Sequence, residues 1–320
     1  MSKRRAYGAD ARLIAAVEAT YGTAPAGGAY RSLDFKQTDL SSEQKLGEDP
    51  LLGRGRNAQD PYRGLIIDEG SVEIPLDVRG IGFWLFALLG PAVTTGTGPY
   101  THVWASGADT LPSLTVEIGH PRLQTPTFFR HTGTMVESLD FDLGREGAAN
   151  ATLKLVAQGE DNAGTTIDAT PEPFVLKRFS QARGYIKRGA TALAGVTGGK
   201  LSFSNTLERV RTIRDDGKID GADPTIASVK GSLTSRFDGV TLLAEAASGD
   251  PISLEYGFTT GSGQSLSFLM PRVFLPKPKY RIAGPGGVEA SFDWQAAHDE
   301  TSGTMMTVTL VNDVEEYQLC

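Results

Sequence analysis

The stretch GSVEIPLD, residues 70–77, returns in altered form as GSLTSRFD, residues 231–238. Both stretches begin with Gly-Ser, alternate afterwards and end on Asp, and each follows an Asp-Pro pair by a few residues, at 60–61 and at 223–224. Short alternating runs bounded by Gly and Pro are typical of half-buried β-strands. The two stretches therefore predict strands at matching places in the two halves of the chain.

Further segments recur in the same order along the chain. The matched pairs are SLDF (32–35) with KLSF (200–203), the apolar stretch ending at Gly90 with a candidate helix ending at Gly249, LPSLTVEIG (111–119) with DPISLEYGF (250–258), and residues 141–158 with residues 280–297. In the last pair, Phe141 matches Tyr280, Leu153 matches Phe292 and Leu155 matches Trp294 without a gap. Each match is weak, but their common order predicts an internal duplication.

Alternating runs fill most of the remaining sequence, and helical patterns are few. We expect one helix within residues 78–90 and another within residues 238–249, while residues 9–20 fit either a helix or an arm that orders on assembly. The predicted fold is mainly β, with two tandem β-sandwich or barrel domains that each carry a short flanking α-helix. The first domain, with the N-terminal arm, covers 1–165 and the second covers 166–320, because residues 159–173 are polar and rich in turn formers.

Composition sets limits on the class of protein. The chain has 320 residues, 40% of them hydrophobic, and a formal net charge of −7, which is the wrong sign for simple capture of a nucleic-acid backbone. The one cysteine is Cys320, so no internal disulfide is expected, as in a reducing cytoplasm. The most apolar run, residues 81–90, is half the length that a bilayer requires, so no membrane association is predicted.

The sequence contains no strong catalytic, cofactor or metal signature. The four histidines have no metal-ligand spacing, and no phosphate-binding loop or nucleophile elbow occurs. Asp140 and Asp142 lie on one face of a predicted strand and would suit acid/base chemistry, but such pairs are more often a solvated face. The acids between residues 215 and 223 do not follow the calcium-loop spacing. We therefore expect no enzyme activity and no cofactor.

Two long polar loops, residues 40–64 and 205–224, occupy the same place in both predicted repeats. Loops of this length inside compact domains are usually functional or disordered. Because both copies keep one, we favour contacts between subunits or between rings over a solvated mobile loop. The candidate contact residues are Arg54, Arg56, Asp60, Arg209, Arg211, Arg214, Asp215 and Asp216.

Three segments resemble phage major tail tube proteins. EATYGTAP (18–25) is similar to their entry segment, residues 70–90 resemble their strand-then-helix unit, and LSFSNTLE (201–208) resembles the strand that opens their second half. The resemblance implies a β-sandwich with a flanking helix, rings stacked into a hollow tube, an inner wall of strands joined between subunits, and a long loop that contacts the next ring.

For a duplicated chain, the resemblance implies a virion structural protein that closes a pseudo-six-fold ring with three copies. The second half lacks the aromatic-rich helix, so six whole chains per ring remain an alternative. The implied partners are other copies of the chain, phage DNA and the tape-measure protein held non-specifically in the lumen, and the tail-tip and tail-terminator proteins at the tube ends. The implied location is the virion tail, assembled in the cytoplasm of the bacterial host.

A tube that conducts DNA must not bind it, because contacts between phosphates and Lys or Arg generate affinity. An acidic lumen would repel the duplex, and the candidate lumen-facing acids are Glu117, Asp140, Asp142, Glu255 and Asp293. The alternative function is a β-sandwich receptor-binding or carbohydrate-binding module. That reading favours clustered exposed aromatics, whereas Trp84, Trp104 and Trp294 are scattered.

Overall fold

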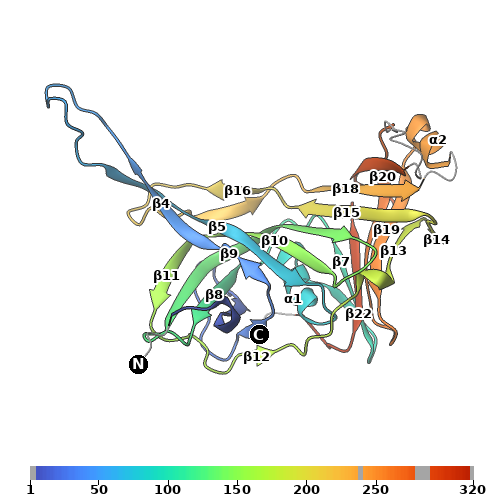
Figure 1. Cartoon of the computed structure of the whole chain (residues 1–320), viewed down its shortest axis with the longest axis horizontal. Helices are drawn as coiled ribbons and strands as arrows, with labels where there is room; N and C mark the ends of the chain where they lie inside the picture. The colour runs from blue at the N-terminus through green and yellow to red at the C-terminus, as the bar shows by residue number, and fades with distance from the viewer. Residues whose placement is uncertain (1–4, 237–240, 278–288, 318–320) are drawn as a thin grey trace.

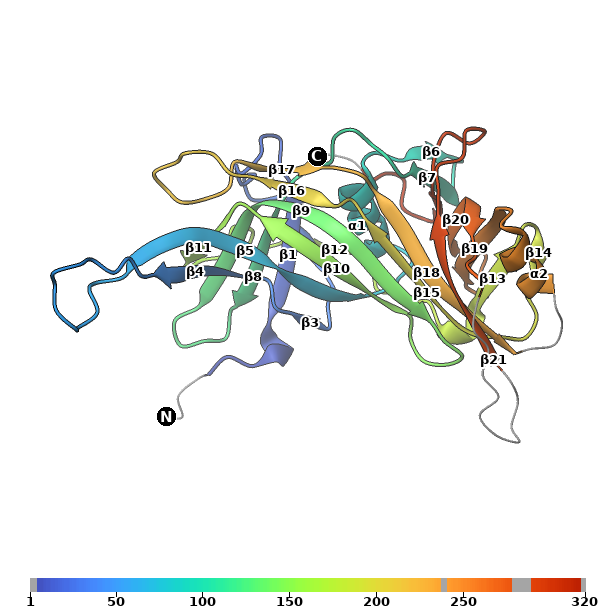
Figure 2. The same ribbon diagram turned by 90° about the horizontal axis from the view of Figure 1, so that it is seen from above.

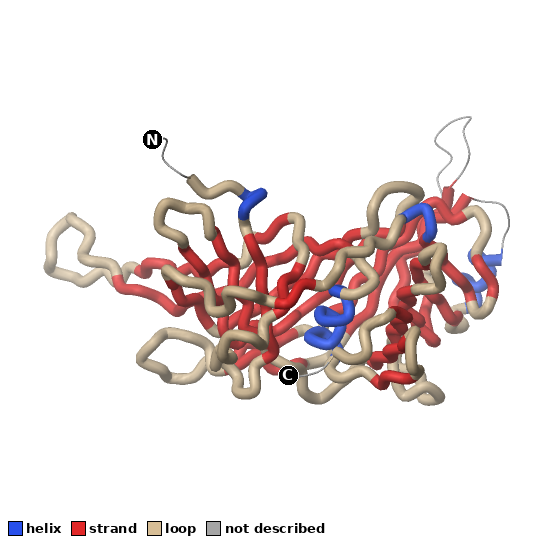
Figure 3. The backbone as a smooth tube through the Cα atoms, turned by 90° about the horizontal axis from the view of Figure 1, so that it is seen from below, coloured by secondary structure: helices blue, strands red, loops and turns tan. Residues whose placement is uncertain are grey.

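The computed structural model describes residues 5–236, 241–277 and 289–317. Its elements are predominantly strands in antiparallel pairs, as the alternating runs predict (Figures 1 and 3). We describe the strands as three layers, two of which share the long strand β9 (Thr127–Leu143).

The largest layer is a sheet that runs through both halves of the chain, hereafter the polar sheet. Its strands lie in the order β3 (Gln37–Thr38) and β4 (Ser41–Gly47) at one edge, then β5 (Tyr62–Pro75), β10 (Asn150–Ala157), the C-terminal part of β9, β15 (Val196–Ser204), β18 (Ser228–Arg236) and β21 (Glu289–Ala296). The two halves meet where β9 pairs with β15.

Two smaller layers cover the apolar side of the polar sheet. One contains β12 (Glu172–Pro173), β2 (Arg31–Leu33), β1 (Arg12–Val17), β8 (Leu114–His120), the N-terminal part of β9 and β11 (Gly159–Ala163). The other contains β14 (Thr191–Ala192), β13 (Gly184–Arg188), β19 (Ile252–Thr259), β20 (Ser265–Phe274), β22 (Thr307–Asn312), β7 (Tyr100–Ala105) and β6 (Val93–Thr95). Because β7 of the first half pairs with β22, strands of the two halves share a sheet.

The helix expected within residues 78–90 is confirmed as α1 (Gly80–Leu89), which lies in the core beside β9 and β7 (Figure 3). Asp77 caps it, because its carboxylate accepts hydrogen bonds from the backbone N–H groups of Gly80 and Ile81 at 2.7 and 3.0 Å. Gly90 ends it with a φ of 87°, which favours glycine. The second helix is α2 (Thr241–Ser248), and short 3-10 turns cover Gly8–Asp10 and Gln181–Arg183.

Strand pairings follow the same order in both halves. In the first half, β1 pairs with β8, β8 with β9, β9 with β10 and β10 with β5; in the second half, β13, β19, β20, β21 and β18 pair in that order. Every one of these pairings is antiparallel. An order of four pairings that occurs in both halves is a stronger regularity than the short sequence matches provide.

The residue registers also coincide. Across β4 and β5, Ser41 lies opposite Glu69 and Leu46 lies opposite Arg63. Adding 161 to these residue numbers gives Ser202 opposite Lys230 and Leu207 opposite Pro224, and both pairs occur in the second half. Across β10 and β5, Leu153 lies opposite Val72 and Leu155 opposite Gly70. The matching pairs across β21 and β18 are Phe292 with Leu233 and Trp294 with Gly231. A shift of one residue would turn each side chain to the other face of the sheet.

Residues 12–17, for which the sequence left a helix or an arm open, form strand β1. Two of the predicted segment matches were wrong in detail. KLSF (200–203) occupies the place of residues 39–42 and not of SLDF, because Leu201 lies opposite Gly231 as Leu40 lies against Gly70. The match of residues 111–119 with 250–258 is displaced by one residue: Leu114, Val116 and Ile118 face the core, as do Leu254, Tyr256 and Phe258. The partner predicted for Phe141, Tyr280, lies outside the described residues.

Candidate assembly surfaces

The polar sheet has one apolar face and one polar face. Along β21, exposed and buried residues follow one another without exception, and parts of β10, β15 and β18 alternate in the same way. Rows of polar residues therefore cross the sheet from strand to strand. One such row contains Gln37, Glu73, Thr152, Asp140, Ser202, Lys230 and Gln295, and the next contains Asp142, Lys200, Ser232 and Asp293.

Three of the predicted lumen-facing acids lie on this polar face: Asp140 and Asp142 on β9, and Asp293 on β21. Lysines lie between them. Lys200 is in register with Asp142 across β15 and β9, and Lys154 forms an ion pair with Glu137 at 2.8 Å. The polar face is therefore mixed in charge, and the sequence did not predict the interleaved lysines.

The other two predicted acids, Glu117 and Glu255, lie elsewhere. Glu117 on β8 is only 2% exposed, so the expectation that it lies on an exposed strand face was wrong. It accepts hydrogen bonds from Arg130 Nε at 2.7 Å and from the backbone N–H of Ile167 at 3.0 Å. Glu255 on β19 accepts hydrogen bonds from the Tyr185 hydroxyl at 2.7 Å and Lys187 Nζ at 3.1 Å. Both carboxylates are used inside the chain.

The predicted loop 40–64 is largely a β-hairpin. Strands β4 and β5 are joined by residues 48–61, and we call this unit the first hairpin; it extends far beyond the body of the molecule (Figures 1 and 2). Arg54, Arg56 and Asp60 are exposed near its tip, and within the described part of the chain they form no ion pair. Apolar side chains are also exposed on this hairpin, namely Leu46, Leu51, Leu52, Tyr62 and Leu65.

The predicted loop 205–224 is a second hairpin, formed by β16 (Leu207–Val210), residues 211–220 and β17 (Gly221–Pro224). It lies beside the first hairpin at the same end of the molecule (Figure 2). Arg209 Nη2 contacts a Glu69 carboxylate oxygen at 2.5 Å, and the backbone N–H of Ile66 donates to Gly217 O at 3.0 Å. The second hairpin therefore docks against the first half of the same chain.

Arg214 closes the loop of the second hairpin. Its guanidinium donates to Asp216 at 2.6 and 2.9 Å and to Asp220 at 2.9 Å, and these contacts hold the pKa of Asp216 well below its usual range. Arg209, Arg214 and Asp216 thus have partners within the chain, which the sequence reasoning missed. Arg211 and Asp215 are exposed, and their contact with another subunit stays a prediction.

A buried polar pair lies at the base of the first hairpin. His131 Nδ1 and an Asp68 carboxylate oxygen are 3.0 Å apart, and both side chains are shielded from solvent. Nearby, buried Glu18 accepts hydrogen bonds from the Ser113 and Thr115 hydroxyls at 2.7 Å and from the N–H of Gly133 at 2.9 Å. The described residues contain no group of three or more potential metal ligands. These carboxylates therefore find hydrogen-bond donors inside the fold, whereas the buried Nε2 of His131 has no hydrogen-bond partner among the described residues.

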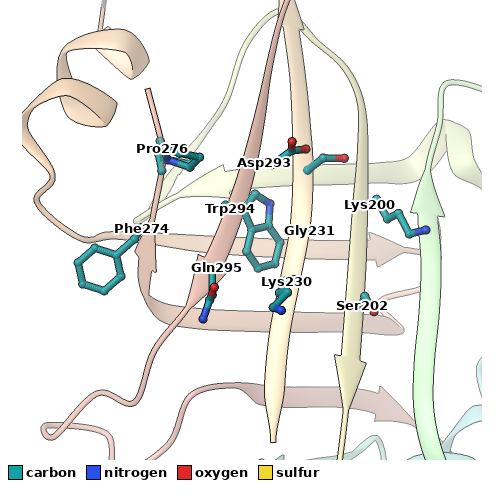
Figure 4. Close-up of a pocket in the computed structure, with 11 residues that line it drawn as sticks. Lys200, Ser202, Lys230, Gly231, Phe274, Pro276, Asp293, Trp294 and Gln295 are labelled. Atoms are coloured by element: carbon teal, nitrogen blue, oxygen red, sulfur yellow. The ribbon is translucent and has the colours of Figure 1, made fainter. Parts of the chain in front are cut away.

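A cavity of about 670 Å3 opens on the polar face at its β21 edge (Figure 4). Its rim contains Lys200, Lys230 and Asp293, while Phe274, Leu275, Pro276 and Trp294 contribute apolar atoms. None of the described helices is long and apolar enough to span a bilayer.

A comparison with protein families identifies the class that these features define. Residues 8–296 match the family model described as phage tail tube protein. This match covers nearly the whole chain, and the chain belongs to the phage tail tube family. It is a structural protein of the virion tail, as the resemblance implied. No curated protein matches the chain.

Proposed function

We propose that three copies of this chain close a ring and that such rings stack into the hollow tube through which phage DNA passes. Membership of the tail tube family supports self-association into a tube. The proposed number of three chains rests on the agreement of strand registers between the two halves. For example, Ser41 lies opposite Glu69 in the first half, and the corresponding residues Ser202 and Lys230 lie opposite each other in the second half. Two equivalent halves per chain give six equivalent positions in a ring of three.

Within the chain, the two halves are joined by the kind of strand pairing that would also join neighbouring chains in such a ring. β9 and β15 join the halves through six register pairs, from Gly199 with Leu143 to Ser204 with Ser138. The offset of 161 makes residues 38–43 the counterpart of residues 199–204. Within the described chain, β3 and β4 pair only with β5, so no strand pairs with their outer edge, although the backbone N–H of Ser42 donates to the Glu160 carboxylate at 3.1 Å. An open edge invites another chain to pair, and ring closure would satisfy it.

The polar sheet would form the wall of the lumen. Its polar face carries hydroxyls and interleaved acids and lysines instead of a basic stripe. Since affinity for DNA grows with the number of phosphates that cationic side chains neutralise, alternating signs keep that number low. In this arrangement, DNA and the tape-measure protein lie in the lumen without sequence-specific contacts. The tip and terminator proteins contact the free faces of the rings at the two ends of the tube.

Electron microscopy of the purified chain across a concentration series tests this function. We expect hollow tubes or closed rings whose amount increases with concentration. A chain that stays a compact monomer at every concentration would overturn the proposal and favour the binding-module alternative. Six whole chains per ring would leave the tube intact and remove the pseudo-six-fold arrangement.

A further inference from the structure

The contact between the second hairpin and the first half of the chain is a complete docking site. Leu207, Ile219 and Ala222 of the hairpin region pack against Met135 on β9 and Val156 on β10. At the rim, Arg209 pairs with Glu69, and the backbone N–H of Asn205 donates to Glu137 O at 2.9 Å. An apolar anchor and an ion pair together hold the hairpin in place.

The second half contains the corresponding site. Val156 lies opposite Met135 across β10 and β9, and Gln295 lies opposite Phe274 across β21 and β20. Adding 139 to the residue numbers of the first pair gives the second pair (135 to 274, 156 to 295). The offset of 161 converts Glu69 into Lys230. Phe274, Gln295 and Lys230 all line the cavity of about 670 Å3 at the β21 edge (Figure 4). In the second half, this cavity therefore occupies the position at which the first half receives the second hairpin.

The first hairpin carries the side chains that such a site requires. Leu46 has the position of Leu207, yet it is 65% exposed whereas Leu207 is 5% exposed. Glu48 has the position of Arg209, directly after the strand, and is exposed. Because Lys230 replaces Glu69 and Glu48 replaces Arg209, the charges of the docked pair occur at the equivalent positions with their signs exchanged.

We propose that the first hairpin of one copy docks in the β21-edge cavity of the neighbouring copy in the ring. Leu46 packs against Phe274 of the second copy, and Glu48 pairs with its Lys230. The occupant is a second copy of this chain, because the charges match and the contact within the chain already provides the geometry. This inference rests on the proposed self-assembly and adds the residues that make the joint.

A charge exchange tests the ion pair. Glu48→Lys and Lys230→Glu each place like charges together and should raise the concentration needed for ring closure by about tenfold, and the double variant should restore most of it. Both side chains are exposed in the single chain, so its thermal unfolding should not change. The docking would be overturned if both single variants assembled like the wild type. It would also be overturned if the loss of assembly in the double variant equalled the sum of the losses in the two single variants.

Cysteine cross-linking tests the apolar contact. In a Cys320→Ser background, Leu46→Cys with Phe274→Cys should form disulfides between chains when rings are oxidised, whereas Leu52→Cys with Phe274→Cys should not, since Leu52 lies near the hairpin tip and is fully exposed. Rings that form normally but give no cross-link contradict the docking alone. A wild-type chain that forms no rings contradicts the proposed function instead, so the two failures are distinguishable.

Discussion

Gly231 lies directly opposite Trp294 across β18 and β21, and the indole ring occupies the space that a side chain on Gly231 would need. The ring is held there because its Nε1 donates to the Tyr256 hydroxyl at 2.8 Å, and that hydroxyl donates to Ser232 O at 2.9 Å. Gly70 occupies the same register in the first half, opposite Leu155, and a Cβ added to Gly70 would lie 2.5 Å from the Cα of Leu40. The Gly that begins both stretches is therefore a packing requirement.

Gly231→Ala should destabilise the chain by about 1–3 kcal/mol, because a methyl group there forces the indole or the backbone of Lys200 to move. Chemical denaturation of the monomer measures this change. Gly164→Ala is the matched control, since an added methyl group meets no atom within 4 Å there. Equal unfolding midpoints for the two variants would show that the close approach at Gly231 is not required.

Asp68→Val should destabilise the chain by about 1–3 kcal/mol, because it leaves buried His131 without its hydrogen-bond partner. The second half suggests the rescue: the offsets place Val229 at the position of Asp68 and Met270 at that of His131, and both are buried core residues. The double variant Asp68→Val/His131→Met should therefore regain most of the lost stability in a denaturation cycle. Additive losses in the double variant would argue against equivalent positions.

The ion pair between Arg79 and Asp313 should make stability depend on pH. Arg79 donates to both Asp313 oxygens, at 2.8 and 2.5 Å, and this contact lowers the pKa of Asp313 from its ordinary value of 3.8. Because the pKa is lower in the folded chain, the contribution is present above the unfolded pKa and is lost as the pH falls through the folded pKa. The difference in Tm between wild type and Asp313→Asn should be largest near neutral pH and vanish in acid. A difference that does not change with pH would contradict this account.

Arg54→Ala/Arg56→Ala should weaken the stacking of rings without changing the Tm of the single chain, because both side chains are exposed on the first hairpin. Arg209→Ala should behave in the opposite way and loosen the second hairpin, since its guanidinium contacts Glu69 within the chain. Sedimentation of tubes and thermal unfolding separate the two effects. Undiminished stacking in the double variant would show that the tip arginines are not the contact between rings.

The sequence predicted the elements that alternation and turns specify. Local pattern predicted the strands that contain Gly70 and Gly231 and the helix near residues 80–89. It predicted long polar loops at residues 40–64 and 205–224, which the structure shows as hairpins. Alternation does not show which edges pair, so β9 joining β15 and β7 joining β22 could not be predicted. The pairing of β8 with β9 and that of β19 with β20 each contain a register shift, so alternation alone does not fix how β8 matches β19.

The candidate surfaces were only partly predictable for a related reason. Charge alone marked Arg209 and Arg214 as contact residues, but their partners, Glu69, Asp216 and Asp220, lie within the chain. Glu117 lies in an alternating run and would be exposed if β8 had one solvent face, yet its strand is buried on both faces. Leu46 was not among the predicted contact residues, and the sequence does not distinguish it from Leu51 and Leu52 in the same segment.

The mass of the closed ring, measured by native mass spectrometry of the purified assembly, tests the central claim most directly. If the two halves occupy equivalent positions, the ring contains three chains of 34.1 kDa each, and its projection in electron micrographs shows six similar lobes. A ring of six whole chains would contradict the equivalence of the halves, whatever the agreement between their strand registers.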